Sequence, residues 1–97
     1  MLITVPSGAS AKLTDILSEA QKTQALASLS PQDGYFRVLI QVLGGQDCYV
    51  EFNAAATSTA GLKIVQNDSV SFATDNLARI NLLATVADNT NVRVLIN

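Results

Sequence analysis

Residues 61–97 read GLKIVQNDSVSFATDNLARINLLATVADNTNVRVLIN, and this stretch decides the fold. Apolar and polar residues alternate in several short runs, and turns rich in Asn and Asp separate the runs. Alternation with a period of two is typical of strands that bury one face. The same period begins upstream, where Phe36, Val38, Ile40 and Val42 are all apolar. Residues 35–97 are therefore predicted to form β-structure.

Polar segments mark where these strands reverse. The predicted turns are residues 44–47, 66–68, 74–76 and 88–91, and the small uncharged run 54–60 is predicted to be a surface loop. The residues expected to face the core are Phe36, Val38, Ile40, Val42, Cys48, Val50, Phe52, Leu62, Ile64, Val70, Phe72, Ile80, Leu82, Ala84, Val86, Val92, Val94 and Ile96. About six short strands without crossover helices predict a mainly β fold: an antiparallel β-sandwich or small barrel, jelly-roll-like.

The N-terminal part has a different pattern. Residues 2–5 form a short apolar run that Pro6 stops, which predicts either an edge strand or an arm that reaches a neighbour. From residue 11 the apolar positions recur at helical spacing, which predicts one short helix over about 11–20. Whether this helix continues to residue 28 is left open, and the turn-forming segment 30–34 ends it.

The composition indicates a single domain whose surface is poorly charged. In this domain, 1–97, residues 1–10 are the arm or edge strand, 11–28 the helical lead-in and 35–97 the sandwich. Charged residues make up only 14% of the chain, against roughly 25% in typical soluble domains. Because a small domain has a large surface to cover, part of that surface is expected to be buried against another subunit.

The same totals argue against several classes of function. The net charge is −2 and the six basic residues are scattered, whereas nucleic-acid binding needs clustered basic residues. The N-terminus has no basic start and only a short apolar run, and no run is long enough for a membrane span, so we expect synthesis in a cytoplasm.

No residue pattern points to catalysis, a cofactor or a metal. The chain contains no histidine that could activate the single cysteine, Cys48, which also occupies a core-facing position. The acids Asp33, Asp47, Asp68, Asp75 and Asp88 each stand alone in a turn rather than in a calcium-binding loop. We therefore expect that the protein is not an enzyme and has no catalytic, cofactor-binding or metal-binding residues.

Several large apolar side chains fall on the outward phase of the predicted strands. Leu39, Leu83 and Leu95 lie in mid-strand between polar neighbours, and Tyr49 shares their phase. If their strands are adjacent, the three leucines form one apolar patch. Two interpretations stay open and do not exclude each other: the N-terminal helix covers the patch, or the patch is a homo-oligomeric interface.

The order of short motifs in the second half resembles a family of virion proteins. YVE at 49–51, GLKI at 61–64, DSVSF at 68–72, LARI at 77–80 and NVRVL at 91–95 are similar to segments of small tailed-bacteriophage proteins. Capsid decoration (cement) proteins and related β-sandwich modules of heads and tails belong to this group. The opening ITVPSGASAKLTDIL, 3–17, is also similar.

The resemblance implies a function and a set of contacts. Such cement proteins are typically trimers at local three-fold positions on the capsid, where an N-terminal segment grips the major capsid protein. By resemblance, Leu2, Ile3 and Val5 belong to the gripping arm, and the Leu39, Leu83 and Leu95 face, with Tyr49, makes the contact between subunits. The family has no catalytic residues.

The expected function is that of a structural protein. It would bind the outer surface of a phage capsid as a homo-oligomer, with a trimer favoured, and stabilise it, after synthesis in the host cytoplasm. Neither nucleic acid nor membrane is an expected partner. The alternatives are a tail, baseplate or head-fibre component and, from another class, a carbohydrate-binding β-sandwich for host attachment. A hydrolase ranks last.

Overall fold

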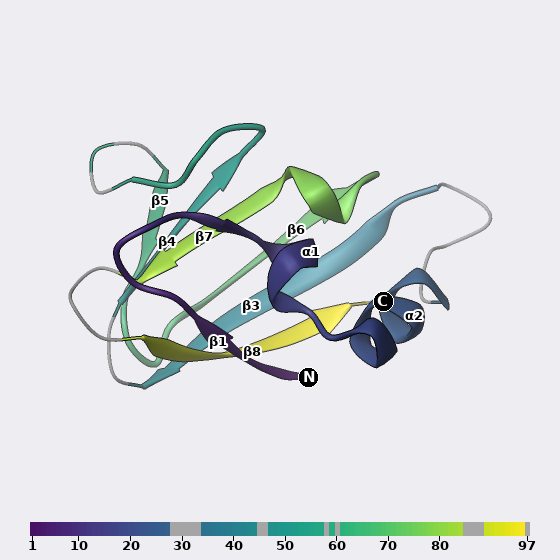
Figure 1. Ribbon diagram of the computed structural model, residues 1–97, viewed down its shortest axis with the longest axis horizontal. Coiled ribbons are helices and arrows are strands. Elements are labelled where there is room, and N and C mark those ends of the chain that lie inside the picture. The colour runs from purple at the N-terminus through teal and green to yellow at the C-terminus, as the bar shows by residue number, and fades with distance from the viewer. Residues whose placement is uncertain (28–33, 45–46, 58, 60, 85–88, 97) are drawn as a thin grey trace.

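Two four-stranded antiparallel sheets face each other in the computed structural model, which describes residues 1–27, 34–44, 47–57, 59, 61–84 and 89–96 (Figure 1). The strands are β1 (Leu2–Val5), β2 (Ala11–Lys12), β3 (Phe36–Gly44), β4 (Cys48–Phe52), β5 (Leu62–Ile64), β6 (Ser69–Thr74), β7 (Ile80–Ala84) and β8 (Thr90–Ile96). The helices are α1 (Leu13–Ile16), α2 (Glu19–Ala27) and the short 3-10 helix η1 (Leu77–Arg79).

The strand order confirms the predicted sandwich. Sheet A has the order β1-β8-β3-β6 and sheet B the order β2-β7-β4-β5. The chain crosses between the sheets at most connections, so that strands close in sequence lie in different layers. Eight strands wound in this way form a jelly roll, a double-sheet arrangement built from Greek keys.

The core lies between the two sheets and follows the predicted alternation at most positions. The core-facing residues of β3 and β7 are buried, together with Cys48, Val50, Ile64, Val92 and Val94. Val70, Phe72 and Ile96 are partly buried, and two predicted core positions are exposed: Phe52 at 38% and Leu62 at 53%. Both lie on the side of the sandwich where β5 and β6 end the sheets, so facing inward does not bury them. Val86 lies outside the described residues.

The N-terminal segment is an edge strand, which is one of the two predicted alternatives. β1 pairs with β8, with Ile3 opposite Val92, and the Met1 ammonium donates to the Val94 carbonyl at 2.7 Å. Ile3 and Val5 are buried in the chain's own core. Of the three residues assigned to the arm by resemblance, only Leu2 is exposed, at 60%. The sheet holds the segment because its alternate side chains complete the core.

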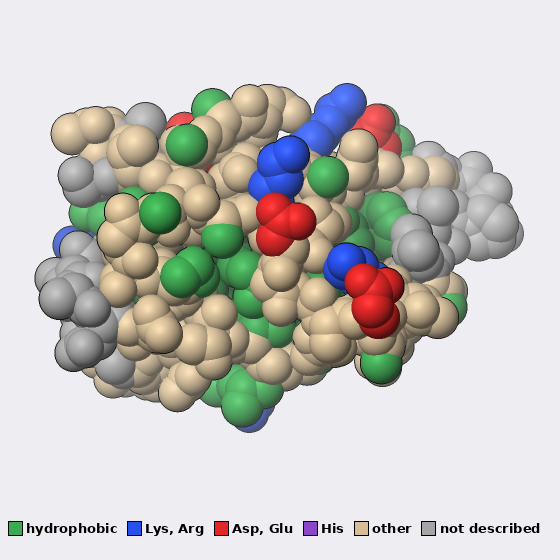
Figure 2. Space-filling model, in the orientation of Figure 1, with side chains coloured by type: hydrophobic (Ala, Val, Ile, Leu, Met, Phe, Trp, Pro, Cys, Tyr) green, Lys and Arg blue, Asp and Glu red, His purple; other side chains and the backbone are tan. Residues whose placement is uncertain are grey.

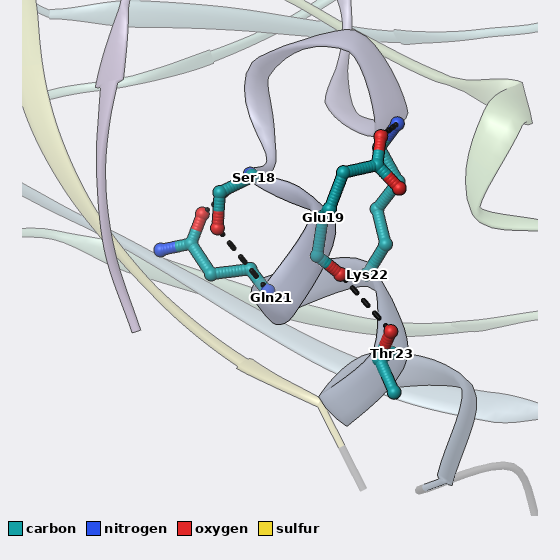
Figure 3. A network of polar contacts seen from close by, with 5 residues as sticks. All are labelled: Ser18, Glu19, Gln21, Lys22 and Thr23. Atoms are coloured by element: carbon teal, nitrogen blue, oxygen red, sulfur yellow. Dashed lines mark hydrogen bonds and ion pairs between the residues drawn. The ribbon is translucent and has the colours of Figure 1, made fainter.

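The predicted helix over 11–20 is wrong in extent. Residues 11–12 form β2, α1 covers only Leu13–Ile16, and Leu17 is extended, with ψ 139°. A second helix, α2, then begins at Glu19. Ser18 and Gln21 start it by a reciprocal capping arrangement: the Gln21 amide donates to Ser18 Oγ at 3.2 Å, and the Ser18 amide donates to Gln21 Oε1 at 2.9 Å (Figure 3).

Candidate functional site: the outer faces of the sandwich

The predicted leucine patch is divided between the two sheets. Leu39 and Leu95 lie directly opposite each other on β3 and β8 of sheet A. Tyr49 and Leu83 lie directly opposite each other on β4 and β7 of sheet B. The expectation of one patch is therefore wrong, and the outward residues form two pairs on opposite sides of the molecule. Alternation shows which side chains point outward, but it does not show to which sheet a strand belongs.

The pair on sheet A is the more exposed of the two. Leu95 is 50% exposed, and Leu39 is partly buried. They border a shallow hollow of about 380 Å³. Its lining is completed by Arg37, Val38, Ser71, Phe72 and Ala73. Small side chains from β6 thus leave the Leu39–Leu95 pair accessible.

The charged side chains that the structure describes on the outward phase of sheet A are two arginines. Arg37 and Arg93 are exposed there, and they stand on the same outward phase as Leu39 and Leu95. The described side chains that share this outward phase on β1, β3, β6 and β8 include no Asp or Glu. A partner surface for this face is therefore best matched if it is apolar with acidic residues around it.

The pair on sheet B has a more charged surrounding. Tyr49 also faces Lys63 of β5, whose ammonium lies 3.6 Å from the Asp47 carboxylate. Glu51 follows on the same face, and both Tyr49 and Leu83 are partly buried. This pair therefore presents less accessible apolar surface than the pair on sheet A.

The packing of α1 does not place it over the Leu39–Leu95 pair. Leu13 and Leu17 are buried in the core cluster instead. α1 packs near β1, β2, β7 and η1, along the side of the sandwich where β1 and β2 end the sheets. Figure 2 shows this side: its charged side chains lie in small groups of opposite sign, with hydrophobic side chains exposed between them. The covering interpretation therefore does not account for Leu95.

A second apolar feature lies on the opposite side of the sandwich and was not predicted as a surface. Phe52 of β4 and Phe72 of β6 close the space between the sheets there, with ring centroids 4.9 Å apart and planes at 86°. Two further apolar side chains are exposed at the neighbouring edge strand: Leu62, the first residue of β5, and Val65, which follows β5. We call this set, Phe52, Leu62, Val65 and Phe72 with the partly buried Val70, the open edge.

A polar hollow of about 530 Å³ is the third surface feature. It is lined by Ser10, Lys12, Asp15, Asn53, Ala54, Ala55, Asn76, Ala78, Arg79 and Asn81. The Asn53 amide donates to the Arg79 carbonyl at 2.9 Å, and Arg79 Nη1 lies 3.2 Å from the Asp75 carboxylate. Sequence reasoning missed this hollow because it combines three separate segments of the chain.

Cys48 has the surroundings of a structural thiol. It is fully buried, and this burial raises the pKa of the thiol to about 11, against a smaller lowering by a backbone hydrogen bond from Leu83. A thiol of this kind is a poor nucleophile at neutral pH. Among the described residues no group of His, Cys, Asp or Glu is arranged to hold a metal ion, and no described helix is long and apolar enough to cross a membrane.

No protein-family model matches the sequence, and neither the curated proteins nor the solved structures compared with it include a match.

Proposed function

We propose that this chain is a structural protein of a bacteriophage virion, which binds the outer surface of the capsid as a homo-oligomer and stabilises it. The observation that carries the proposal is the Leu39–Leu95 pair. Two leucines lie side by side on the outer face of sheet A, and Leu95 is half exposed. An exposed apolar pair on a face poor in charge favours contact with another protein.

The charge on sheet A indicates which kind of contact it makes. Two copies that met face to face would bring the exposed Arg93 side chains of both copies toward each other, which like-charge repulsion disfavours. The chain as a whole carries a net charge of −2, so its other surfaces are more acidic than this face. A head-to-tail contact between different surfaces fits this distribution, and such contacts form a ring when the rotation between neighbouring copies closes. A trimer is the ring that the resemblance favours.

The energetics fit a protein that works in many copies. A leucine that is fully removed from water contributes about 1.5–3 kcal/mol, and the Leu39–Leu95 pair is already partly buried. One contact of this size does not offset the cost of association, which is about 4–15 kcal/mol. Repeated over a symmetric capsid lattice, the same contact gains strength by multivalency. The jelly roll occurs in viral capsid proteins, but also in lectins and cupins, so the fold is compatible with the proposal without selecting it.

The test of the oligomer compares the two outer faces. Size exclusion with light scattering measures the mass of the wild type, of Leu95→Asp and of Leu83→Asp. We expect Leu95→Asp to lower the mass, and Leu83→Asp, on the opposite face, to lower it as well only if sheet B supplies the other side of the head-to-tail contact. A Leu95→Asp protein that keeps both its circular dichroism spectrum and its wild-type mass would reject the sheet A contact.

The test of the capsid role uses heads and tails of the phage that encodes the chain. We expect the purified protein to co-sediment with capsids that lack it, to raise the temperature at which they release DNA, and to be found in isolated heads. Recovery with isolated tails alone would support the tail, baseplate or head-fibre alternative instead.

The polar hollow favours one candidate from another class, a carbohydrate-binding module. Asn, Lys, Asp and Arg side chains at its rim can hydrogen-bond sugar hydroxyls, although no aromatic residue lines it for stacking. A glycan array probed with the labelled protein tests this function. Binding that Lys12→Ala abolishes would favour host attachment, whereas no binding at millimolar glycan would reject it.

A further inference from the structure

The four edge strands of the sandwich are protected to very different degrees. β2 has two residues, and β5 has three, one of which is Lys63. β1 is followed by Pro6, and Gln21 Nε2 of α2 donates to its Leu2 carbonyl at 3.4 Å. Short length, lysine, proline and coverage are the usual ways to prevent an edge strand from pairing with another chain.

β6 has none of these protections. Its six residues read SVSFAT and include no charge and no proline. Its one strand neighbour is β3, and no other described helix or strand packs closely along its free side. Among the four edges, β6 is therefore the one able to accept a further strand.

The hydrogen bonds at the start of β6 show which backbone groups are unpaired. The Val42 amide donates to the Asp68 carbonyl at 3.0 Å, and this pair continues the register in which Gln41 faces Ser69. In an antiparallel ladder, residue pairs that exchange backbone bonds alternate with pairs that do not. The residues whose N–H and C=O groups point away from sheet A are therefore Ser69, Ser71 and Ala73.

We propose that β6 pairs in antiparallel register with β6 of a second copy of this chain, across a two-fold axis at Ser71. Ser71 then faces Ser71 of the other copy, and Ser69 faces Ala73. These three pairs use every outward-pointing backbone group of β6. The residues with outward-pointing backbone groups are spaced symmetrically about Ser71, so β6 of one copy matches β6 of the other in antiparallel register. Two copies of sheet A then join into one eight-stranded sheet.

The side chains of β6 suit this register on both faces. On the outer face they are Ser69, Ser71 and Ala73, which are too small to obstruct the approach and carry no charge. On the core face the register sets Val70 opposite Phe72 of the second copy. Both side chains are partly buried in the single chain, and Phe72 is held by its edge contact with Phe52. Such aromatic and β-branched cross-strand pairs stabilise a sheet.

This contact goes beyond the proposed function and does not depend on it. It uses the backbone of β6 and the open edge, whereas the proposed ring contact uses the Leu39–Leu95 pair. The Leu95→Asp background therefore isolates the two-fold contact. There we expect twice the chain mass of 10.2 kDa in light scattering, even if the capsid role is wrong.

Disulfide cross-linking tests the register directly. Paired residues that exchange hydrogen bonds have Cα atoms about 5.5 Å apart, within the range that a disulfide spans. Ser71→Cys is expected to form a covalent dimer under mild oxidation. Ser69→Cys is the matched control on the same strand and face: its two copies lie four residues, about 13 Å, apart along the strand and stay unlinked. The native thiol, Cys48, is buried and does not compete.

A second pair of variants tests the contact without new thiols. Ser71→Lys places two ammonium groups opposite each other at the axis, and we expect the mass in the Leu95→Asp background to fall by half. Thr4→Lys puts the same charge on the outer face of β1, the other edge of sheet A, and is expected to leave the mass unchanged. A monomeric Leu95→Asp protein at millimolar concentration, or cross-linking of Ser69→Cys as fast as Ser71→Cys, would overturn the proposal.

Discussion

The two long sides of this sandwich are built in opposite ways. On the side of β1 and β2, the first third of the chain closes the gap between the sheets: Val5 and Leu13 are fully buried, and Leu17 is nearly so. On the side of β5 and β6, the open edge has Leu62 at 53% and Phe52 at 38% exposure. Both sides present core-phase residues, but only the first has a segment that covers them.

This difference indicates which side of the sandwich is covered by the chain's own residues and which side has apolar surface that a partner could cover. The N-terminal residues are used within the fold, bonded to β8 and covered by α2. The open edge instead combines apolar side chains with an unprotected strand, which in soluble proteins favours pairing with another chain. A change on the closed side is therefore expected to affect stability, and a change on the open side to affect association.

The largest expected effect is on the closed side. Leu13→Ala removes a fully buried side chain and leaves a cavity, so the free energy of unfolding should fall by about 2–5 kcal/mol. Leu62→Ala, the same substitution on the open edge, should cost less than about 1 kcal/mol because its side chain is half in water already. Urea unfolding followed by circular dichroism measures both. Equal losses would mean that the two sides do not differ.

A backbone position on the open edge is expected to come next. Gly61 has φ +104°, and an added Cβ would lie 2.6 Å from the Val50 carbonyl oxygen of β4. Strained backbone of this kind costs about 1–3 kcal/mol, and the contact with β4 adds to it, so Gly61→Ala should destabilise the β4–β5 pair. Gly8→Ala is the control: Gly8 also has a positive φ, +83°, but nothing lies within 4 Å of the added atom. If both variants unfold at the same urea concentration, the contact with β4 contributes nothing.

The sequence predicted the layers of the sandwich better than its edges. Alternation is local, so it correctly assigned Val38, Ile40 and Val94 to the core. It could not assign β7 to sheet B or β8 to sheet A, because partner choice depends on the whole chain, and this is why one predicted leucine patch became two pairs. Leu62 was predicted to be buried because its phase faces the core, but its side chain is 53% exposed, because alternation does not show that β5 is an edge strand.

The polar hollow was beyond sequence reasoning, but the helix boundary was not. Lys12, Asn53 and Asn76 come together only when three connections fold over one end of sheet B. The start of α2, in contrast, could be predicted from a local pattern, the capping box. In Ser18-Glu19-Ala20-Gln21 a serine is followed three residues later by a glutamine. The apolar spacing of Leu13, Ile16 and Leu17 outweighed that signal and predicted a single helix.

That capping arrangement gives a smaller expected effect, confined to the closed side. Ser18→Ala removes the acceptor for the Gln21 amide and should cost about 1 kcal/mol, while α2 frays and the Leu2 carbonyl loses its cover. Thr23→Ala is the control within the same helix, since its hydroxyl bonds the Glu19 carbonyl at 3.0 Å in mid-helix (Figure 3). Hydrogen exchange of α2 and β1 should rise in Ser18→Ala alone. Unchanged exchange in β1 would show that α2 does not protect this edge.

The last effect is the smallest at neutral pH, where it is absent, and it appears only in alkali, at a thiol beside the open edge. Cys48 lies opposite Ile64 of β5, and burial raises the pKa of its thiol from 9.0 to about 11. The folded state therefore favours the neutral thiol. Its contribution is fully present below pH 9 and is lost as the pH rises from 9 through 11, by at most about 1.4 kcal/mol per pH unit.

Urea unfolding of the wild type and of Cys48→Ala between pH 7 and pH 11 measures this contribution. We expect a constant difference in unfolding free energy up to about pH 9, and above it a loss in the wild type that the variant does not share, because only the wild type has a thiol to ionise on unfolding. Parallel curves over the whole range would mean that water reaches Cys48 in the folded state. The open edge would then extend inward to β4, and the contrast between the two sides would be larger than the side-chain exposures indicate.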